Sequence, residues 1–404
     1  MSTLRKKAYF FVQIPHFRFL SRFDKFRRHL YNYGIRQHFS PIIMERMACM
    51  RYVTIDSLRE GMKLGRTLYR KADVMLAKGI TLTPQYINSI RRCGFPGVYI
   101  EDELSSDIEV TPLISDELRL ETTRRLAKIH DMAKFDHGKG PSKLPDITLQ
   151  IEDIVSELCR NRDIMVNMTE LSCHDNYTYS HSLNVAMLSI LLGIGMKFNR
   201  SDLIGLGTGA LLHDIGKINI SKRILNKPGP LTDEEYTLVK KHPKDGYDYI
   251  TKRFRISTKH ALTILDHHER FDGGGYPYGR TGTEISTYGR ICAVADVYDA
   301  LNSQRPYRKA LPVHECVEYI MAGADTQFDP GIVDIFVHRI APYPLGTSVK
   351  LSNGWTGLVV ANYSDYSLRP KLRIYQKSGL HVAPFEISLK DDPNYLNVTI
   401  TGIT

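Results

Sequence analysis

The chain has 404 residues, of which 42% are hydrophobic and 24% are charged, as in an ordinary globular protein of two or three domains. Its six cysteines are scattered without a Cys-x-x-Cys pair, which argues against a disulfide framework and predicts reduced thiols in a cytoplasmic protein. The formal net charge is +10, yet residues 1–49 alone carry ten Lys and Arg against two acidic residues. Because the rest of the chain is close to neutral, a basic nucleic-acid-binding face is excluded.

The first 49 residues mix basic and aromatic side chains and lack the apolar stretch of a secretory signal. We interpret residues 1–49 as an upstream extension without a role in the fold, either disordered or not native to the protein. A basic membrane-surface segment is the alternative. No transmembrane segment is expected, because the longest apolar run, residues 185–196, is only about a dozen residues long.

Residues 50–105 are expected to form a small mixed α/β domain. Thr83-Pro84 predicts the start of a short helix that ends near Cys93-Gly94, and Val98–Ile100 predicts a closing strand. No cluster of potential ligands occurs here, which favours a regulatory module.

Residues 106–149 are expected to be a helical linker. Apolar positions such as Leu118, Leu126 and Ile129 predict a helix over 113–135, and glycines and a proline predict a loop over 136–145.

Residues 150–342 have a strongly helical pattern. Ser201 is the expected cap of a helix through Leu212, and Thr232 with Glu235 predicts a capping box for a helix ending at His242-Pro243. Residues 343–404 are expected to form a small β-rich appendage, with strands near 347–350, 357–361, 372–375 and 396–400.

The helical region contains a group of potential metal ligands. They are His181, the adjacent pair His213-Asp214, His242, the pair His267-His268, Asp296 and Asp299. A carboxylate has two oxygens and can bridge two cations, which together clamp a phosphate and acidify water. Imidazoles with carboxylates suit transition metals better than Mg²⁺ or Ca²⁺. Unrelated surface and core histidines are the competing interpretation.

The stretch from Asp266 to Pro277 joins two adjacent histidines to a glycine-rich turn that ends in Tyr276-Pro277. Glycine allows backbone to approach a phosphate or sugar closely, and a tyrosine ring can stack on a base. A surface turn after a helix is the simpler alternative, which the attached histidine pair makes less attractive.

Three motifs resemble the HD-GYP family, the bacterial cyclic di-GMP phosphodiesterases of the HD superfamily. They are His213-Asp214-Ile215-Gly216-Lys217, His267-His268-Glu269-Arg270 with Gly275-Tyr276-Pro277, and Asp296-Val297-Tyr298-Asp299-Ala300-Leu301 with Arg305-Pro306-Tyr307-Arg308. The resemblance covers residues 150–340. It implies a mainly α fold, an all-helical metallohydrolase core between the small mixed domain and the β-rich appendage.

The resemblance also implies a role for each matching residue. One metal would be held by His181, His213, Asp214 and Asp296, and a second by Asp214, His242, His267 and His268. Lys217 would assist the leaving oxygen near the scissile phosphate, and Asp299 would orient the nucleophile or ligand by hydrogen bonding. Tyr276, Arg305 and Arg308 would contact the substrate.

The implied reaction is hydrolysis of cyclic di-GMP to pGpG, GMP or both by a hydroxide that bridges two metals, iron or manganese. Some relatives use a glutamate four residues before the first histidine for a third metal, but Tyr177 stands there in this chain, so two metals are expected. The alternatives are a phosphodiesterase for another cyclic dinucleotide, such as cyclic GMP-AMP, and a non-catalytic cyclic di-GMP receptor. A homodimer is compatible with the sequence, although no heptad or apolar stripe requires one.

Overall fold

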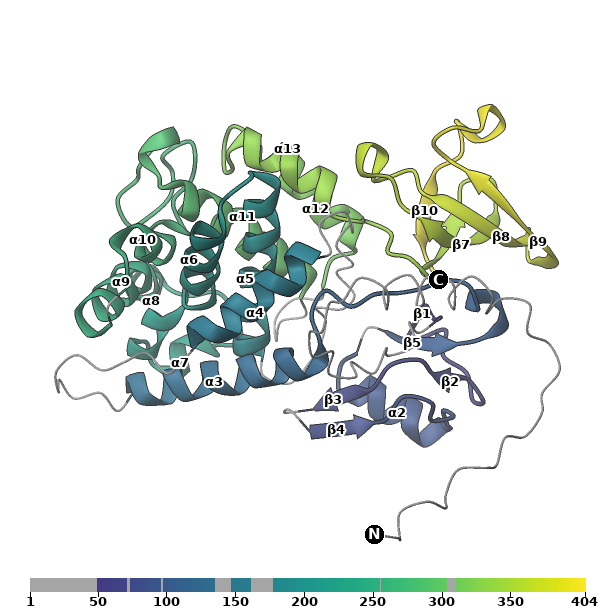
Figure 1. Ribbon diagram of the computed structural model, residues 1–404, viewed down its shortest axis with the longest axis horizontal. Coiled ribbons are helices and arrows are strands. Elements are labelled where there is room, and N and C mark those ends of the chain that lie inside the picture. The colour runs from purple at the N-terminus through teal and green to yellow at the C-terminus, as the bar shows by residue number, and fades with distance from the viewer. Residues whose placement is uncertain are drawn as a thin grey trace, which may run out of the picture. The chain divides into compact units, whose positions relative to one another are not determined.

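The computed structural model describes residues 49–70, 73–95, 97–134, 147–160, 177–254, 256–303 and 310–404 (Figure 1). The expected extension, apart from Cys49, and the expected loop over 136–145 lie outside the described residues, as do Arg305 and Arg308. Within the described ranges, no helix combines the length and the apolar character needed to cross a membrane.

The first described region contains a small sheet and one helix. Strands β1 (Arg51–Thr54), β2 (Lys63–Leu64) and β5 (Gly97–Glu101) form an antiparallel sheet in the order β1-β5-β2, and β3 (Leu68–Arg70) pairs with β4 (Asp73–Leu76). The helix α2 (Pro84–Arg92) begins as predicted, because the Thr83 side chain accepts a hydrogen bond from the backbone of Tyr86. Its Ile90 packs with Val53 and Val98 in a core of their own.

The chain between residues 116 and 339 is mostly helical (Figure 1). Its helices are α3 (Asp116–Lys134), α4 (Ile147–Arg160), α5 (Tyr177–Gly195), α6 (Arg200–Leu211), η3 (Ile215–Asn219), α7 (Lys222–Leu225), α8 (Asp233–Val239), α9 (His242–Arg253), α10 (Thr258–Asp266), η4 (Gly282–Glu284), α11 (Thr287–Asn302), α12 (Val313–Ala322) and α13 (Pro330–Arg339).

Helix α5 lies at the centre of this region. It packs against α3, α4, α6, α11 and α13, and residues 181–193 are buried without interruption, as expected for a helix that is apolar all round. Leu118, Leu126 and Ile129 of α3 belong to the same hydrophobic core. The segment expected to be a linker therefore contributes a helix to the core, because its apolar positions face α4 and α5.

Helices α6 and α10 approach each other closely at a glycine. A Cβ on Gly209 would lie 2.6 Å from the backbone oxygen of His260 and 2.6 Å from the Thr263 side chain. Only glycine fits there without displacing α10. The close packing brings together the C-terminal ends of both helices, where His213 and His267 lie.

Several helix ends differ from the sequence prediction. Asn199, not Ser201, caps α6, and its side chain accepts from the backbone of Asp202. The capping box of Thr232 and Glu235 is confirmed, but α8 ends at Val239 and His242 begins α9. The expected end at His242-Pro243 was wrong because proline is well tolerated in the first turn of a helix, where its missing N–H has no partner to lose.

The last region is a five-stranded antiparallel sheet in the order β10-β6-β7-β8-β9. Its strands are β6 (Ser348–Leu351), β7 (Trp355–Ala361), β8 (Lys371–Lys377), β9 (Leu380–Ser388) and β10 (Ile400–Ile403). Val349, Val359 and Leu372 form its core. The predicted fold class, a mainly α core with small strand-containing regions on either side in sequence, is confirmed.

Candidate metal centre

Seven histidine and aspartate side chains converge within the helical region. Their ligand atoms form three overlapping groups, and within each group all of these atoms lie within 4.8 Å of one another. The groups are His181 with His213 and Asp296, His242 with His267 and His268, and His213 with Asp214 and His267. Together they contain the seven residues to which the resemblance assigns a metal, and Asp299 is not among them.

The first group joins α5, α11 and the end of α6. The Nε2 atom of His181, in α5, lies 3.1 Å from Oδ1 of Asp296, in α11. His213, just beyond α6, has its Nε2 atom 3.9 Å from the same oxygen. All three side chains are buried, so one carboxylate oxygen and two imidazole nitrogens face a common point away from solvent.

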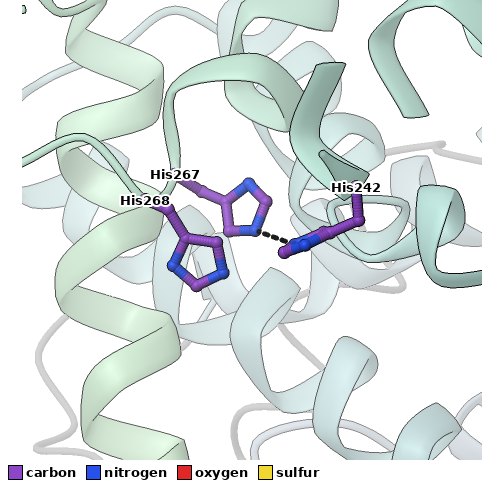
Figure 2. Close-up of side chains that lie close together, drawn as sticks. All are labelled: His242, His267 and His268. Atoms are coloured by element: carbon purple, nitrogen blue, oxygen red, sulfur yellow. Dashed lines mark hydrogen bonds between the residues drawn. The ribbon is translucent and has the colours of Figure 1, made fainter. Parts of the chain in front are cut away.

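The second group is formed by three histidines at helix ends (Figure 2). His242 begins α9, His267 follows the last residue of α10, and His268 comes next. The Nε2 atoms of His242 and His267 are 3.2 Å apart, and the His268 ring centroid lies 4.2 Å from that of His267 and 5.0 Å from that of His242.

Asp214 lies between the two groups. Its Oδ2 atom is 3.4 Å from Nε2 of His213, and its Oδ1 atom is 3.4 Å from Nε2 of His242. Each carboxylate oxygen thus faces a histidine of a different group. This arrangement is the one that a carboxylate needs to bridge two cations.

The orientation of three imidazoles is fixed by helix ends. The Nδ1 atoms of His213, His242 and His267 lie 2.8, 2.7 and 2.8 Å from the backbone oxygens of the residues three positions earlier. Those carbonyls belong to the last turns of α6, α8 and α10, which lack partners within their helices. Because a carbonyl oxygen only accepts, each Nδ1 donates, and the neutral ring keeps its lone pair on Nε2.

These lone pairs provide a test of whether a cation fits. When both Nδ1 atoms donate to carbonyls, the Nε2 atoms of His242 and His267, joined by the dashed line in Figure 2, are two lone pairs 3.2 Å apart. A cation shared between them would stabilise this arrangement. Burial lowers the pKa of His267 well below its usual value, which keeps a proton off that ring. In addition, His213 Nε2 and Asp214 Oδ1 are buried without a hydrogen-bond partner, a costly state that a shared metal ion would relieve. The donor set therefore fits a metal.

The protonation states support the same conclusion. Burial, followed by the charge of nearby His242, lowers the pKa of His268 to about 3, so that the ring is neutral. Burial alone would raise the pKa of Asp214, but His213 and Lys217 hold it well below its usual value. His268 is thus neutral and Asp214 is ionised, the forms in which these side chains bind metals.

Asp299 lies behind His181 rather than beside the group of ligand atoms. Its Oδ2 atom accepts from His181 Nδ1 at 2.7 Å, and its Oδ1 atom accepts from the Asn184 amide at 2.8 Å. Burial lowers the pKa of His181, but its hydrogen bonds to Asp296 and Asp299 outweigh burial and raise that pKa to about 9. Asp299 thus contacts an imidazole of the cluster, and the expected hydrogen bond to the nucleophile or ligand stays a prediction. Sequence reasoning missed Asn184, which lies one turn after His181 on the same face of α5.

Lys217 and Tyr276 line the outer side of the cluster. The Nζ atom of Lys217 lies 2.6 Å from Oδ2 of Asp214, and its side chain is 33% exposed. The Tyr276 ring lies 4.7 Å from the His268 ring at an angle of 31°, and its backbone N–H donates to the His268 carbonyl. The other two expected substrate contacts, Arg305 and Arg308, are outside the described residues.

The loop that carries Tyr276 is held by two buried carboxylates. Glu269 accepts hydrogen bonds from the backbone N–H groups of Tyr278 and Arg280 at 2.7 and 3.1 Å. Asp266 pairs with the Arg280 guanidinium at 2.6 Å. Sequence reasoning gave neither carboxylate a role. Their position just before and after His267-His268 is the signal that could have suggested one.

These features describe a helical region with a histidine–aspartate cluster that is able to bind metal. Residues 164–332 match the family model described as the HD domain, so this part of the chain is similar to HD domains.

Several curated proteins are similar in sequence to part of this chain. The chain is 36% identical over 225 residues to a cyclic di-GMP phosphodiesterase of Pseudomonas aeruginosa, covering 56% of this chain and 54% of that protein. It is 46% identical over 126 residues to a cyclic di-GMP phosphodiesterase response regulator of Xanthomonas campestris pv. campestris, covering 31% and 33%. It is 39% identical over 154 residues to a 3′3′-cGAMP-specific phosphodiesterase of Vibrio cholerae, covering 38% and 33%.

The chain thus spans about half the length of the first of these relatives and a third of the other two. The resemblance to HD-GYP phosphodiesterases that the motifs indicate is confirmed.

Proposed function

We propose that this chain is a metal-dependent phosphodiesterase that hydrolyses cyclic di-GMP. The observation that carries the proposal is the position of Asp214, whose two oxygens each lie 3.4 Å from a histidine of a different group. Phosphoester hydrolysis is the chemistry that two bridged cations perform best. The substrate is proposed from the names of the relatives, two of which are cyclic di-GMP phosphodiesterases.

The seven clustered side chains would hold two divalent transition metals, iron or manganese. One cation would be bound by His181, His213, Asp296 and one oxygen of Asp214, and the other by His242, His267, His268 and the second oxygen of Asp214. When bound, the pair supplies neutralisation of the phosphate oxygens and acidifies water.

Lys217 is the proposed acid for the leaving group. Its ammonium lies 2.6 Å from Asp214 and its side chain is one-third exposed, so it can reach from the buried cluster to a bound phosphate. In the reaction, a water oxygen would form a bond to phosphorus and release a proton to solvent while the bond from phosphorus to the 3′ oxygen breaks. Lys217 would donate the proton that the 3′ oxygen takes up, and the first product would be linear pGpG. A second cleavage would give GMP.

The proposed role of Asp299 follows from its contact with His181. A carboxylate that accepts from the Nδ1–H of a ligand imidazole fixes the ring and makes Nε2 a better donor to a metal. Asp299 is therefore a positioning residue. Tyr276, beside His268, would form part of the substrate-binding wall, and Arg305 and Arg308 remain proposed phosphate or guanine contacts.

Two alternatives concern the same site. Cyclic GMP-AMP is a competing substrate because a relative with 39% identity is specific for it. A receptor that binds cyclic di-GMP without cleaving it is the second alternative. The presence of all seven ligands together with Lys217 favours an enzyme, because a receptor has no need of the complete set.

The proposal is tested by hydrolysis of cyclic di-GMP with protein purified anaerobically and loaded with Fe(II) or Mn(II). We expect pGpG or GMP to accumulate, separated and identified by chromatography, and cyclic GMP-AMP to be cleaved more slowly. Asp214→Ala should lower kcat by at least about a thousandfold, because losing the bridge removes several kcal/mol of barrier lowering and each 1.4 kcal/mol is tenfold.

The matched control is Asp334→Ala, since the Asp334 side chain is 76% exposed on α13. It should keep wild-type activity and metal content. Faster cleavage of cyclic GMP-AMP would reassign the substrate. A folded, metal-loaded protein that binds cyclic di-GMP without cleaving any cyclic dinucleotide would identify a receptor.

A further inference from the structure

An exposed tyrosine lies next to Tyr276 of the proposed substrate-binding wall. Tyr236, on α8, is 45% exposed, and its ring centroid lies 6.4 Å from that of Tyr276 with the two planes at 83°. Tyr276 in turn lies against His268, a member of the second histidine group. Tyr236 is thus one aromatic ring further from the metal ligands than Tyr276.

A lysine ammonium lies over the Tyr236 ring. Lys240 follows the last residue of α8, four residues after Tyr236. Its Nζ atom lies 4.5 Å from the Tyr236 ring centroid. Such a pair is a cation–π interaction between a flexible ammonium and a half-exposed aromatic face. It brings a positive charge and an aromatic surface together at the edge of the site.

The position of α8 is fixed independently of any ligand. The capping box of Thr232 and Glu235 satisfies its first turn, and Glu235 also pairs with Lys227 at 2.5 Å. Among the described residues, the Tyr236 hydroxyl makes no hydrogen bond. The position of the ring is therefore set by helix α8 and not by polar contacts of the hydroxyl.

We propose that Tyr236 and Lys240 form a second substrate-binding position, in which the tyrosine ring stacks on a purine base and the lysine pairs with the phosphate remote from the cleaved bond. The inference rests on the proposed function and extends it, because a cyclic dinucleotide has two bases and two phosphates. While one phosphate reacts at the metal centre, the other half of the ring must be bound nearby. An aromatic face with an adjacent cation matches a base with an adjacent phosphate.

Stacking is tolerant of base identity because every base has a π face. The position is therefore expected to contribute affinity for guanine and adenine alike, and the choice between cyclic di-GMP and cyclic GMP-AMP must be made elsewhere in the site. The consequence is testable, since substitutions of Tyr236 should weaken both substrates equally.

The experiment measures kcat and KM for cyclic di-GMP with Tyr236→Leu, Tyr236→Phe and Lys240→Met. Tyr236→Leu should raise KM about tenfold, the lower range of a lost base stack, and leave kcat close to wild type because the base lies away from the reacting phosphorus. Tyr236→Phe keeps the ring and should remain within about twofold. Lys240→Met should raise KM severalfold and weaken its dependence on salt, because one charge pair is removed.

Leu238→Ala is the matched control, because Leu238 is 46% exposed on the same helix and points to another face. Its KM should equal that of wild type. An unchanged KM in Tyr236→Leu, in a wild-type background that cleaves cyclic di-GMP, would overturn the binding position alone. Failure of Tyr236→Phe to restore KM would also overturn it, since stacking requires only the ring. If the metal-loaded wild type cleaves no cyclic dinucleotide, the proposed function is wrong and the binding position falls with it.

Discussion

The two halves of the metal centre are built in different ways. The first half takes His181 and Asp296 from within α5 and α11, where backbone atoms are already hydrogen bonded in their helices. The His181 imidazole is therefore oriented by a side chain, Asp299, which is itself held by Asn184. The other imidazole of this half, His213, uses a helix-end carbonyl. The second half takes His242 and His267 from helix ends, where unpaired carbonyls orient the rings directly.

This difference indicates which substitutions should weaken metal binding in each half. A side chain that orients a ligand can be lost by substitution, whereas a backbone carbonyl is present whatever residue carries it. We therefore expect the first half to depend on residues that bind no metal, and the second half to depend only on its ligands and on the packing of its helices. Two predictions test that contrast, and a third concerns a buried histidine beside the cluster.

The largest effect is expected from removing one ligand in each half. His181→Gln and His242→Gln should each leave one tightly bound metal in place of two and lower kcat by about a hundredfold or more, because one of two cations is lost. Metal per chain is measured by mass spectrometry after anaerobic loading, together with kcat.

His338→Gln is the control for these variants, because His338 is half-exposed on α13 and distant from the cluster in sequence. It should retain two metals and full activity. Three metals in the wild type would contradict the expectation that Tyr177 excludes a third site. Retention of both metals in either variant would contradict the assignment of its histidine.

An intermediate effect is expected for the residue that orients His181. Asp299→Asn preserves size but removes the charge that accepts from Nδ1, so metal affinity at the first half should fall about 10–100-fold. Metal affinity at the second half should stay the same. Competition with a chelator can measure the two affinities, because the two halves should release metal in separate steps. Ser303→Ala, which removes a hydroxyl 3.4 Å from Asp299 Oδ2, is the matched control. Equal weakening of both halves would break the proposed contrast.

The smallest effect concerns a buried histidine that binds nothing in the cluster. His130, on α3, is 6% exposed and packs edge-on against the ring of Tyr179, with centroids 5.2 Å apart. Burial lowers the pKa of His130 from 6.5 to about 4. The unfolded chain therefore takes up a proton below pH 6.5 that the folded chain refuses, and stability is lost as the pH falls from 6.5 towards 4.

At pH 5 the loss from this group is about 2 kcal/mol relative to neutral pH. The prediction is checked by urea denaturation at pH 7 and pH 5 with wild type and His130→Phe. The variant cannot be protonated at this position and should lose less stability between the two pH values. Equal losses in both proteins would show that His130 does not carry the dependence.

The sequence predicts the clustered histidine and aspartate residues better than it predicts the residues that orient them. Adjacent histidine and aspartate residues carry a chemical signature, so all seven clustered residues were expected to act together. The role of Asp299 was less predictable, because its distance from His181 along the chain hides a contact that only the packing of α5 against α11 creates. Asn184 gave no signal, since an asparagine in a buried helix looks like any other polar residue.

Helix ends show the same limit. The capping box at Thr232 could be predicted because it is a local exchange of hydrogen bonds between neighbours in sequence. The break between α8 and α9 could not, because Pro243 suits either the end of one helix or the first turn of the next. Strand β9 was missed because it is largely exposed and lacks the alternation of a half-buried strand.

The hydrogen bonds from ligand imidazoles to helix-end carbonyls have a consequence for metal binding. Because the same bond terminates a helix and orients a ring, the helix end and the direction of its Nε2 lone pair are set together. A cation that binds meets rings that are already oriented, so metal binding and the packing of these helix ends should stabilise each other. Exchange of the bound metals should therefore leave the positions of these helix ends unchanged.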